Sequence, residues 1–307
     1  MRTTISAEGR ARVQSGRWLR FLLIGLAIWL ASVVVTAATK DLILIPTVVL
    51  WGSFLVPVAA VIFDYEHEAS ATLTRDKVFY AFVYGGVLGV LVAVWLEKWL
   101  IGSGAPQYLG VGLIEEAAKL LALIVIAWNL PRYTMRDGLV LGAAVGFGFA
   151  ALESSGYAFV ALFSTKGGLS LSNLVFTEVL RGVLAPIGHG LWTGILGAVL
   201  FQASSGGRLR ITGKVVGAYL LVSLLHGLWD SMNEIALVLT LLLTGTSAQV
   251  HQITSGHLPQ PTTSYQVHLF VAIFFAGFVI VTSVGLRIFR HLWLEALQGT
   301  SQKRSPG

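Results

Sequence analysis

The sequence has no cysteine among its 307 residues and little charge of either sign. The missing cysteines exclude disulfide bonds, thiolate metal ligands and a cysteine nucleophile, and they leave the compartment undetermined by cysteine usage. Charged residues make up only 12% of the chain, which is about half the share found in a typical soluble domain. A soluble globular protein is therefore not what this composition predicts.

Apolar residues dominate instead, at 55% of the chain with a mean hydropathy of +0.77. A helix of about 20 apolar residues spans the hydrocarbon core of a bilayer, which is ~30 Å thick. We therefore predict an all-α polytopic membrane protein with about eight transmembrane helices. The eight apolar stretches lie near residues 18–38, 42–63, 78–96, 108–128, 138–163, 173–201, 212–244 and 267–289.

The basic residues test this arrangement, because inner loops of membrane proteins carry an excess of lysine and arginine. With the N-terminus inside and eight spans, 16 of the 21 basic residues fall on the inner side, and only Lys40, Lys98 and Lys166 fall in outer loops. We therefore expect both termini inside, with 212–244 forming one long, tilted or broken helix. Topology explains the net charge of +6, so we expect no nucleic-acid partner.

The domain organisation is predicted to be simple. No loop is long enough to fold alone, so we expect residues 1–298 to form one integral membrane domain, with a motif-bearing core at 108–245. Residues 299–307 follow the last apolar stretch and are expected to form a disordered C-terminal tail. The lipid bilayer is the predicted environment, and the sequence leaves the oligomeric state open.

Ionisable side chains inside four consecutive spans are the unusual feature of the chain. A charged residue at mid-membrane costs roughly 2.5 to 3.5 kcal/mol on insertion scales, so such residues are by default candidates for a functional site. Several recur at spacings of three or four residues, which place them on a common helical face. They are Glu115, Glu116 and Lys119 in the fourth span, Glu153 between Phe149 and Tyr157 in the fifth, Arg181 and His189 with Pro186 in the sixth, and His226 and Asp230 in the seventh.

Depth decides whether these groups can meet. Counting 1.5 Å per residue along each span puts Glu115, Glu153 and His226 at a similar level in the outer half of the bilayer. Glu178 and Glu234 are expected near the outer interface and are left out of the site. The spacing thus predicts a polar site formed by spans four to seven.

His189 reaches that level only if its helix starts late. A start at Asn173 would place it about 25 Å below the outer surface, whereas a start near Leu184 would bring it level with the other groups. Proline is favoured in the first turn of a helix, which makes Pro186 a natural starting point. We therefore expect residues 173–183 to form a separate interfacial or re-entrant segment.

The formal charge of the cluster points to a cation. Four carboxylates against two basic side chains leave a remainder of −2, which a divalent metal or protonation of the carboxylates would remove. Two histidines and a carboxylate, with a fourth position open to water, are typical of catalytic zinc. The groups counted are Glu115, Glu116, Glu153, Asp230, Lys119 and Arg181.

The motifs resemble those of the PrsW family of intramembrane metalloproteases, which is grouped with the CAAX prenyl proteases and the bacteriocin-processing proteins. The resemblance comprises EExxK at 115–119, FxxxExxxY at 149–157, RxxxxPxxH at 181–189 and HxxxD at 226–230. Four motifs in order on consecutive spans are specific. The CAAX branch typically has a histidine where Glu153 stands and an asparagine where Asp230 stands, so this sequence is closer to the PrsW branch.

The resemblance implies a hydrolase of the cell membrane that cuts a peptide bond of a single-span membrane protein near the outer face. An anti-sigma factor is the best-known substrate of this kind. It also implies a divalent metal, of which zinc suits the ligand set, bound by His189, His226 and one carboxylate. That carboxylate is either Glu153 or a member of the Glu115 and Glu116 pair.

Roles for the remaining residues follow as expectations from the resemblance. Adjacent residues diverge by about 100° on a helix, so only one of Glu115 and Glu116 can face the site. We favour Glu116 as the general base by a narrow margin, with Glu115 paired to Lys119. The other expected roles are orientation of His226 or of a water at the metal by Asp230, and stabilisation of the oxyanion by Tyr157 or Arg181.

Two other classes of protein remain open. A transporter or proton-coupled carrier also places Glu, Asp and His inside its spans. The two halves of this chain, however, show no repeated pair of interrupted spans. A non-catalytic membrane scaffold is the second alternative, in which the polar residues only join helices through hydrogen bonds.

Overall fold

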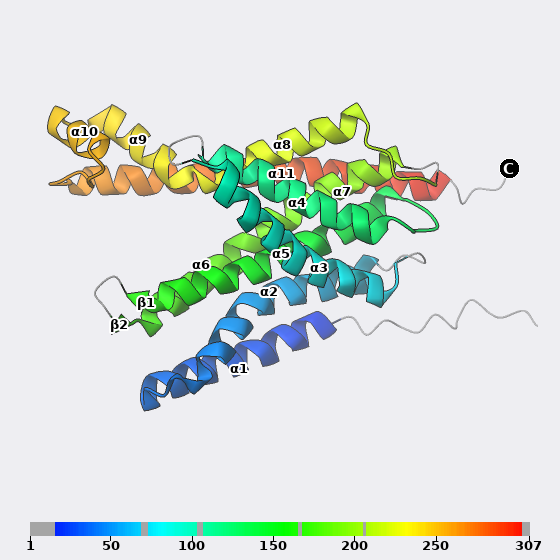
Figure 1. Ribbon diagram of the computed structural model, residues 1–307, viewed down its shortest axis with the longest axis horizontal. Helices are drawn as coiled ribbons and strands as arrows, with labels where there is room; N and C mark the ends of the chain where they lie inside the picture. Colours follow the sequence, from blue (N-terminus) through cyan, green and yellow to red (C-terminus); the bar gives the residue numbers. More distant parts are fainter. Residues whose placement is uncertain (1–15, 69–72, 103–106, 165–167, 205–206, 303–307) are drawn as a thin grey trace, which may run out of the picture.

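The computed structural model describes residues 16–68, 73–102, 107–164, 168–204 and 207–302, and these form a helical bundle (Figure 1). The predicted all-α fold is confirmed, apart from a pair of two-residue strands. The long helices are α1 (Arg17–Thr39), α2 (Ile45–Glu68), α3 (Arg75–Leu100), α4 (Gln107–Ala127), α5 (Met135–Leu162), α6 (Leu171–Ala185), α7 (Leu191–Ala203), α8 (Gly213–Asp230), α9 (Met232–Thr244) and α11 (Ser264–Gln302). The short elements are a 3-10 helix (Leu42–Leu44), β1 (Phe163–Ser164), β2 (Gly168–Leu169), a π-helical segment (Pro186–Gly190) and α10 (Ser247–Thr254).

Polar caps set where several spans begin. The side-chain oxygens of Thr74, Thr134 and Ser170 accept hydrogen bonds from backbone N–H groups in the first turns of α3, α5 and α6. Such caps satisfy N–H groups that have no partner within the helix. The boundaries of these spans therefore follow from local sequence as well as from hydropathy.

The number of spans follows from length, composition and the position of the ends. Six helical stretches in the described residues are long and apolar enough to cross a membrane, and the bent pair α8 and α9 makes a seventh. The start of α1 and the end of α11 lie at the same end of the molecule, on the right in Figure 1. Helix α4, which carries Glu115, Glu116 and Lys119, is the predicted span that does not belong to these seven.

The stretch predicted as one long, tilted or broken helix is broken. Helix α8 ends at Asp230, α9 begins at Met232, and their axes differ by 61°. The bend places the last turn of α8 beside the polar cluster and directs α9 toward α10, at the opposite end from the start of α1 and the end of α11 (Figure 1). The break thus coincides with the last motif residue.

The separate segment predicted at 173–183 is wrong. Helix α6 starts at Leu171 and continues through the π-helical segment into α7, so that 171–203 form a single span. Proline usually breaks a helix, because it lacks an N–H and its ring meets the carbonyl four residues earlier. The wider π turn around Pro186 accommodates the ring, and the helix does not end there.

Glycines let α5 pack closely on its neighbours. A Cβ on Gly148 would meet the carbonyl oxygen of Phe82 in α3, and one on Gly146 would meet the carbonyl of His189. Small residues of this kind permit close approach of membrane helices, where dispersion and hydrogen bonds drive association. Helix α5 is accordingly the centre of the bundle, and it packs against both α3 and the π-helical segment.

The C-terminal end differs in part from the predicted tail. Helix α11 continues to Gln302, so residues 299–302 belong to this helix. The rest of the predicted disordered tail, 303–307, lies outside the described residues.

Candidate active site

Helix α4 contributes three buried ionisable side chains. The Lys119 Nζ lies 3.1 Å from Glu115 Oε2 and 2.9 Å from Glu116 Oε1, and its side chain is fully buried. The predicted pair of Glu115 and Lys119 is present, and Glu116 shares the same ammonium group. One cation thus compensates part of the charge of two adjacent carboxylates.

His189 connects α4 with α5. Its Nδ1 accepts a 2.8 Å hydrogen bond from Lys119 Nζ, which leaves the proton on Nε2. Nε2 lies 3.0 Å from Glu153 Oε2 and donates to that carboxylate. The ring also packs on Phe149, with ring centroids 5.3 Å apart, so both the tautomer and the orientation of His189 are fixed.

His226 on α8 has a matching arrangement. Its Nδ1 lies 2.9 Å from Glu116 Oε1 and donates to it. The other nitrogen, Nε2, faces Glu115 Oε2 at 3.5 Å and Asp230 Oδ2 at 3.2 Å. Each histidine therefore uses one nitrogen on a supporting carboxylate and turns the other toward Glu115.

Arg181 closes the cluster on the α6 side. Its Nη2 donates to Glu153 Oε2 at 2.5 Å, and its Nε donates to Ser154 Oγ at 3.0 Å. The guanidinium also lies over the ring of Tyr157, 4.2 Å from the centroid. Because Glu153 accepts from both Arg181 and His189, its Oε2 is engaged by two donors.

Glu115, His189 and His226 lie at a similar depth along their helices. This depth is measured from the helix ends on the same side as the start of α1 and the end of α11. Glu115 lies 12 residues before the end of α4, His189 lies 14 before the end of α7, and His226 lies 13 after the start of α8. At 1.5 Å per residue these positions are about 18 to 21 Å from those ends. The spans differ in length at the opposite end, which is why counting from there misplaced His189.

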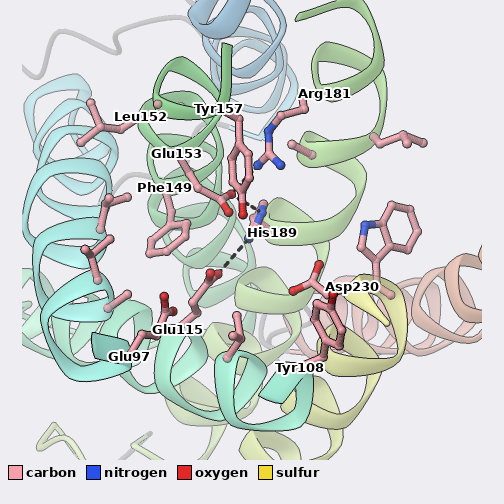
Figure 2. A pocket seen from close by; sticks show the side chains of 18 of the residues that line it. Glu97, Tyr108, Glu115, Phe149, Leu152, Glu153, Tyr157, Arg181, His189 and Asp230 are labelled. Atoms are coloured by element: carbon pink, nitrogen blue, oxygen red, sulfur yellow. Dashed lines mark hydrogen bonds and ion pairs between the residues drawn. The ribbon is translucent and has the colours of Figure 1, made fainter. Parts of the chain in front are cut away.

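A cavity of about 640 Å³ opens beside the cluster (Figure 2). Of the two adjacent glutamates, Glu115 lines this cavity, whereas Glu116 is fully buried and Thr193 Oγ1 lies 3.4 Å from its second oxygen. Only one of the pair lines the cavity, and that residue is Glu115. The other polar lining residues are Glu97, Tyr108, Glu153, Tyr157, Arg181, His189 and Asp230.

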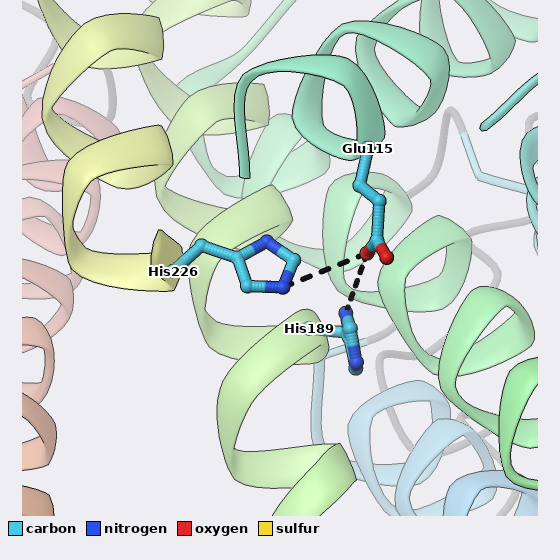
Figure 3. A group of neighbouring side chains, drawn as sticks. All are labelled: Glu115, His189 and His226. Atoms are coloured by element: carbon cyan, nitrogen blue, oxygen red, sulfur yellow. Dashed lines mark ion pairs between the residues drawn. The ribbon is translucent and has the colours of Figure 1, made fainter. Parts of the chain in front are cut away.

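Glu115, His189 and His226 offer three ligand atoms within 4.8 Å of one another (Figure 3). Glu115 Oε2 lies 3.8 Å from His189 Nδ1 and 3.5 Å from His226 Nε2. Ligand atoms around a tetrahedral zinc ion, with bonds of about 2.0 to 2.1 Å, lie roughly 3.3 to 3.4 Å apart. The donor set therefore fits a metal ion.

The surroundings of this group also fit a metal. Metal-binding histidines usually donate their second N–H to a carboxylate, which fixes the ring and raises its basicity. Glu153 and Glu116 hold these positions for His189 and His226. Lys119 donates to the same His189 nitrogen that would bind the metal, but it has two carboxylates as further partners, so its charge stays compensated without that hydrogen bond.

Reasoning from the sequence missed three polar or aromatic residues of the cavity lining, which are Glu97, Tyr108 and Trp229. Glu97 lies in the last turn of α3 beside Lys98, where charged residues are ordinarily read as interfacial. Tyr108 is the second residue of α4, and its hydroxyl donates to Glu234 at 2.8 Å. Because Glu97 directly follows the apolar stretch predicted at 78–96, its position carried no signal of a cavity residue.

Glu178, which was predicted near the outer interface, is buried within the helical bundle. Its side chain is buried between α6 and α1, and Trp29 Nε1 donates to its Oε2 at 2.9 Å. The carboxylate lies against Gly52 of α2, where a Cβ would meet it. Glu178 does not line the cavity, so leaving it out of the site remains correct.

The helical bundle with this enclosed polar cluster defines a multi-pass integral membrane protein whose candidate active site lies within the bundle. A family profile described as PrsW family intramembrane metalloprotease matches residues 22–255, and the chain belongs to this family of proteases. A curated relative, Protease PrsW of Geobacillus kaustophilus (strain HTA426), is 24% identical over 168 residues, covering 54% of this chain and 69% of the relative. No solved structure matches the chain. The predicted family is confirmed.

Proposed function

We propose that this protein is an intramembrane metal-dependent endopeptidase that cleaves a single-span membrane protein near the outer membrane face, in the manner of anti-sigma-factor release. One observation carries the proposal. His189 and His226 are each held by a carboxylate through one nitrogen and turn the other nitrogen toward Glu115. A transporter relay needs no such convergence of two oriented histidines on one carboxylate.

Glu115, His189 and His226 would hold the metal, for which zinc suits the donor set. When bound, such an ion lowers the pKa of a coordinated water and polarises the carbonyl of the scissile bond. Glu153 was one of the predicted ligands, but its Oε2 already accepts from Arg181 and His189. We therefore assign Glu153 the task of orienting His189.

The general base is assigned to Asp230 in place of the predicted Glu116. Glu116 is fully buried, its Oε1 accepts from Lys119 and His226, and it does not reach the cavity. Asp230 lines the cavity, and its Oδ2 lies 3.2 Å from His226 Nε2. A general base must be within hydrogen-bond reach of the water it deprotonates, and Asp230 meets that condition for a water in the cavity.

Tyr157 is assigned the stabilisation of the oxyanion. It lines the cavity and is partly exposed, so its hydroxyl would donate to a substrate oxygen bound there. Arg181 is engaged by Glu153 and Ser154 and lies over the Tyr157 ring, so its part is to hold that ring and Glu153 in place. A preorganised donor of this kind stabilises charge that develops in the transition state.

The position of the cavity supports cleavage near the outer face. Glu97 lies in the last turn of α3 and Tyr108 in the first turn of α4, so the cavity adjoins the α3–α4 connection. That connection is on the opposite side from the chain termini when α1, α2 and α3 each cross the membrane. With the termini inside, as the basic residues predict, the cavity belongs to the outer half of the bilayer.

A comparison of membrane proteomes tests this function. Cells that carry the wild-type chain should contain a single-span protein shortened near its outer membrane boundary, and cells with Asp230→Asn or Glu115→Gln should contain it intact. His268→Ala, at an exposed position of α11, is the matched control and should leave the shortened form unchanged. The same shortened protein in both site variants would contradict the proposal.

A further inference from the structure

Glu97 lines the cavity but has no part in the catalytic roles assigned above. It projects from α3 beside Glu115 of α4, and both side chains enter the cavity from the same wall (Figure 2). It does not belong to the group of three ligand atoms formed by Glu115, His189 and His226. A buried carboxylate oxygen is costly unless it has a hydrogen-bond partner, so its presence at this position requires one.

That partner is missing among the residues that the structure describes. The Oε1 atom of Glu97 is buried and has no hydrogen bond to any of them. A buried polar atom without a partner loses about 1 to 3 kcal/mol, more when it is charged. Glu97 lines the cavity, so a molecule bound there can supply the missing donor.

The charge of the site specifies what kind of donor this is. Within the cluster and its cavity, the carboxylates are Glu97, Glu115, Glu116, Glu153 and Asp230, and the cations are Lys119 and Arg181. Five negative against two positive groups leave a formal charge of −3, and a divalent metal leaves −1. The remaining negative charge has no internal compensation, and Glu97 is the carboxylate with the unpaired oxygen.

We propose that Glu97 determines the specificity of the cavity by binding a lysine or arginine side chain of the substrate close to the scissile bond. This inference rests on the protease function proposed above. The cation of such a side chain supplies both the missing hydrogen bond and the missing positive charge. Val90 and Val94, on the same wall of α3, provide apolar surface for its alkyl stem.

The opposite wall is suited to the same ligand. Tyr108 and Trp229 line the cavity with aromatic rings, which attract cations over their faces. Arg181 is the cationic lining residue described by the structure, and its charge is paired with Glu153. An acidic substrate side chain would therefore meet a net negative charge and no free cation in the described part of the cavity.

A reporter library tests the assignment. The full-length chain is expressed with single-span reporters whose residues at the outer membrane boundary are randomised, and the cleaved fraction is sequenced. We expect lysine and arginine to be enriched about tenfold over neutral residues at one position, the effect of one charged hydrogen bond. Glu97→Gln should abolish this enrichment, and Glu97→Lys should replace it with enrichment of aspartate and glutamate.

Asp76→Asn is the matched control, because Asp76 is an exposed carboxylate at the other end of the same helix. It should keep the enrichment of the wild type, and thermal unfolding in detergent should show that each variant is folded. An unchanged preference for basic residues in Glu97→Gln would overturn the inference while leaving the protease function intact. A wild-type chain that cuts no reporter would contradict the protease function and this inference with it.

Discussion

In a soluble protein the buried segments are the more apolar ones. In this protein the buried spans that carry the motifs are less apolar than the exposed spans at the edge of the bundle. In α5 and in the span formed by α6 and α7, 78% of the 18-residue apolar stretch is buried inside the protein. The corresponding shares are 11% for α11 and 22% for α1. The buried spans are nevertheless the less apolar ones, with hydropathies of 1.4 and 1.6 against 2.5 and 2.4. The interior of this protein is thus more polar than its surface.

The reason is the solvent. Side chains that face lipid gain nothing from leaving it for an apolar interior, so burial in this bundle follows packing and polar pairing. Glycines of α5 allow close contact, and the charged groups of α4, α6, α7 and α8 find their partners only inside the bundle. The comparison predicts that equivalent substitutions have large effects in the buried spans and small ones in α11 or at exposed positions.

The largest effect on metal binding and cleavage is expected from removal of His189 or His226. His189→Ala and His226→Ala each remove one of three predicted ligands, so purified protein should lose its divalent metal and its cleavage activity. The loss of metal affinity should exceed the roughly 100-fold that loss of a supporting carboxylate can cause. Metal analysis by mass spectrometry measures it, with His268→Ala as the exposed counterpart in α11. Equal metal content in all three variants would exclude the assigned ligands.

A smaller effect is expected from the carboxylates that hold the histidines. Glu116→Gln and Glu153→Gln keep the shape of each side chain but weaken the hydrogen bond to the ring, and metal affinity should fall about 10- to 100-fold. Competition with a fluorescent chelator measures this affinity. Glu295→Gln in α11, where the carboxylate accepts from Gln202 instead, should leave it unchanged. If Glu295→Gln weakened metal binding as much as the other two, the supporting role would be wrong.

The smallest effect concerns stability alone. Gly148→Ala would drive a methyl group against the carbonyl oxygen of Phe82, and strain of this kind typically costs about 1 to 3 kcal/mol. Gly217→Ala on α8 meets open space and should be neutral or slightly stabilising, because alanine favours a helix. Unfolding in detergent, followed by circular dichroism, compares the two. Similar midpoints would show that the α3–α5 contact is looser than the structure indicates.

Much of the site was predictable because helical spacing is a property of the sequence. The pairs Glu115 with Lys119 and His226 with Asp230 are four residues apart, and both interact in the structure. Four motifs on consecutive spans also identified the family. The eight apolar stretches gave the helices, since the length of a span follows from the thickness of the bilayer.

Features that depend on how helices meet were not predictable in this way. The depth of His189 relative to the other site residues depends on the unequal lengths of the spans. The π turn at Pro186 has no simple sequence signature. Which of Glu115 and Glu116 faces the cavity depends on the rotation of α4 against α8. Glu97 and Glu178 carry no motif, and their burial follows only from the packing of α3 and α6.

The π-helical segment has a consequence for the direction of side chains along its span. Arg181 and Thr193 are twelve residues apart, and at 100° per residue a regular α-helix would point them about 120° away from each other. One π turn absorbs an additional residue, which reduces the divergence to about 20°. Both side chains therefore reach the same cluster, Arg181 through Glu153 and Thr193 toward Glu116. Deleting a single residue of 186–190 would restore a regular helix and turn one of these contacts toward the lipid.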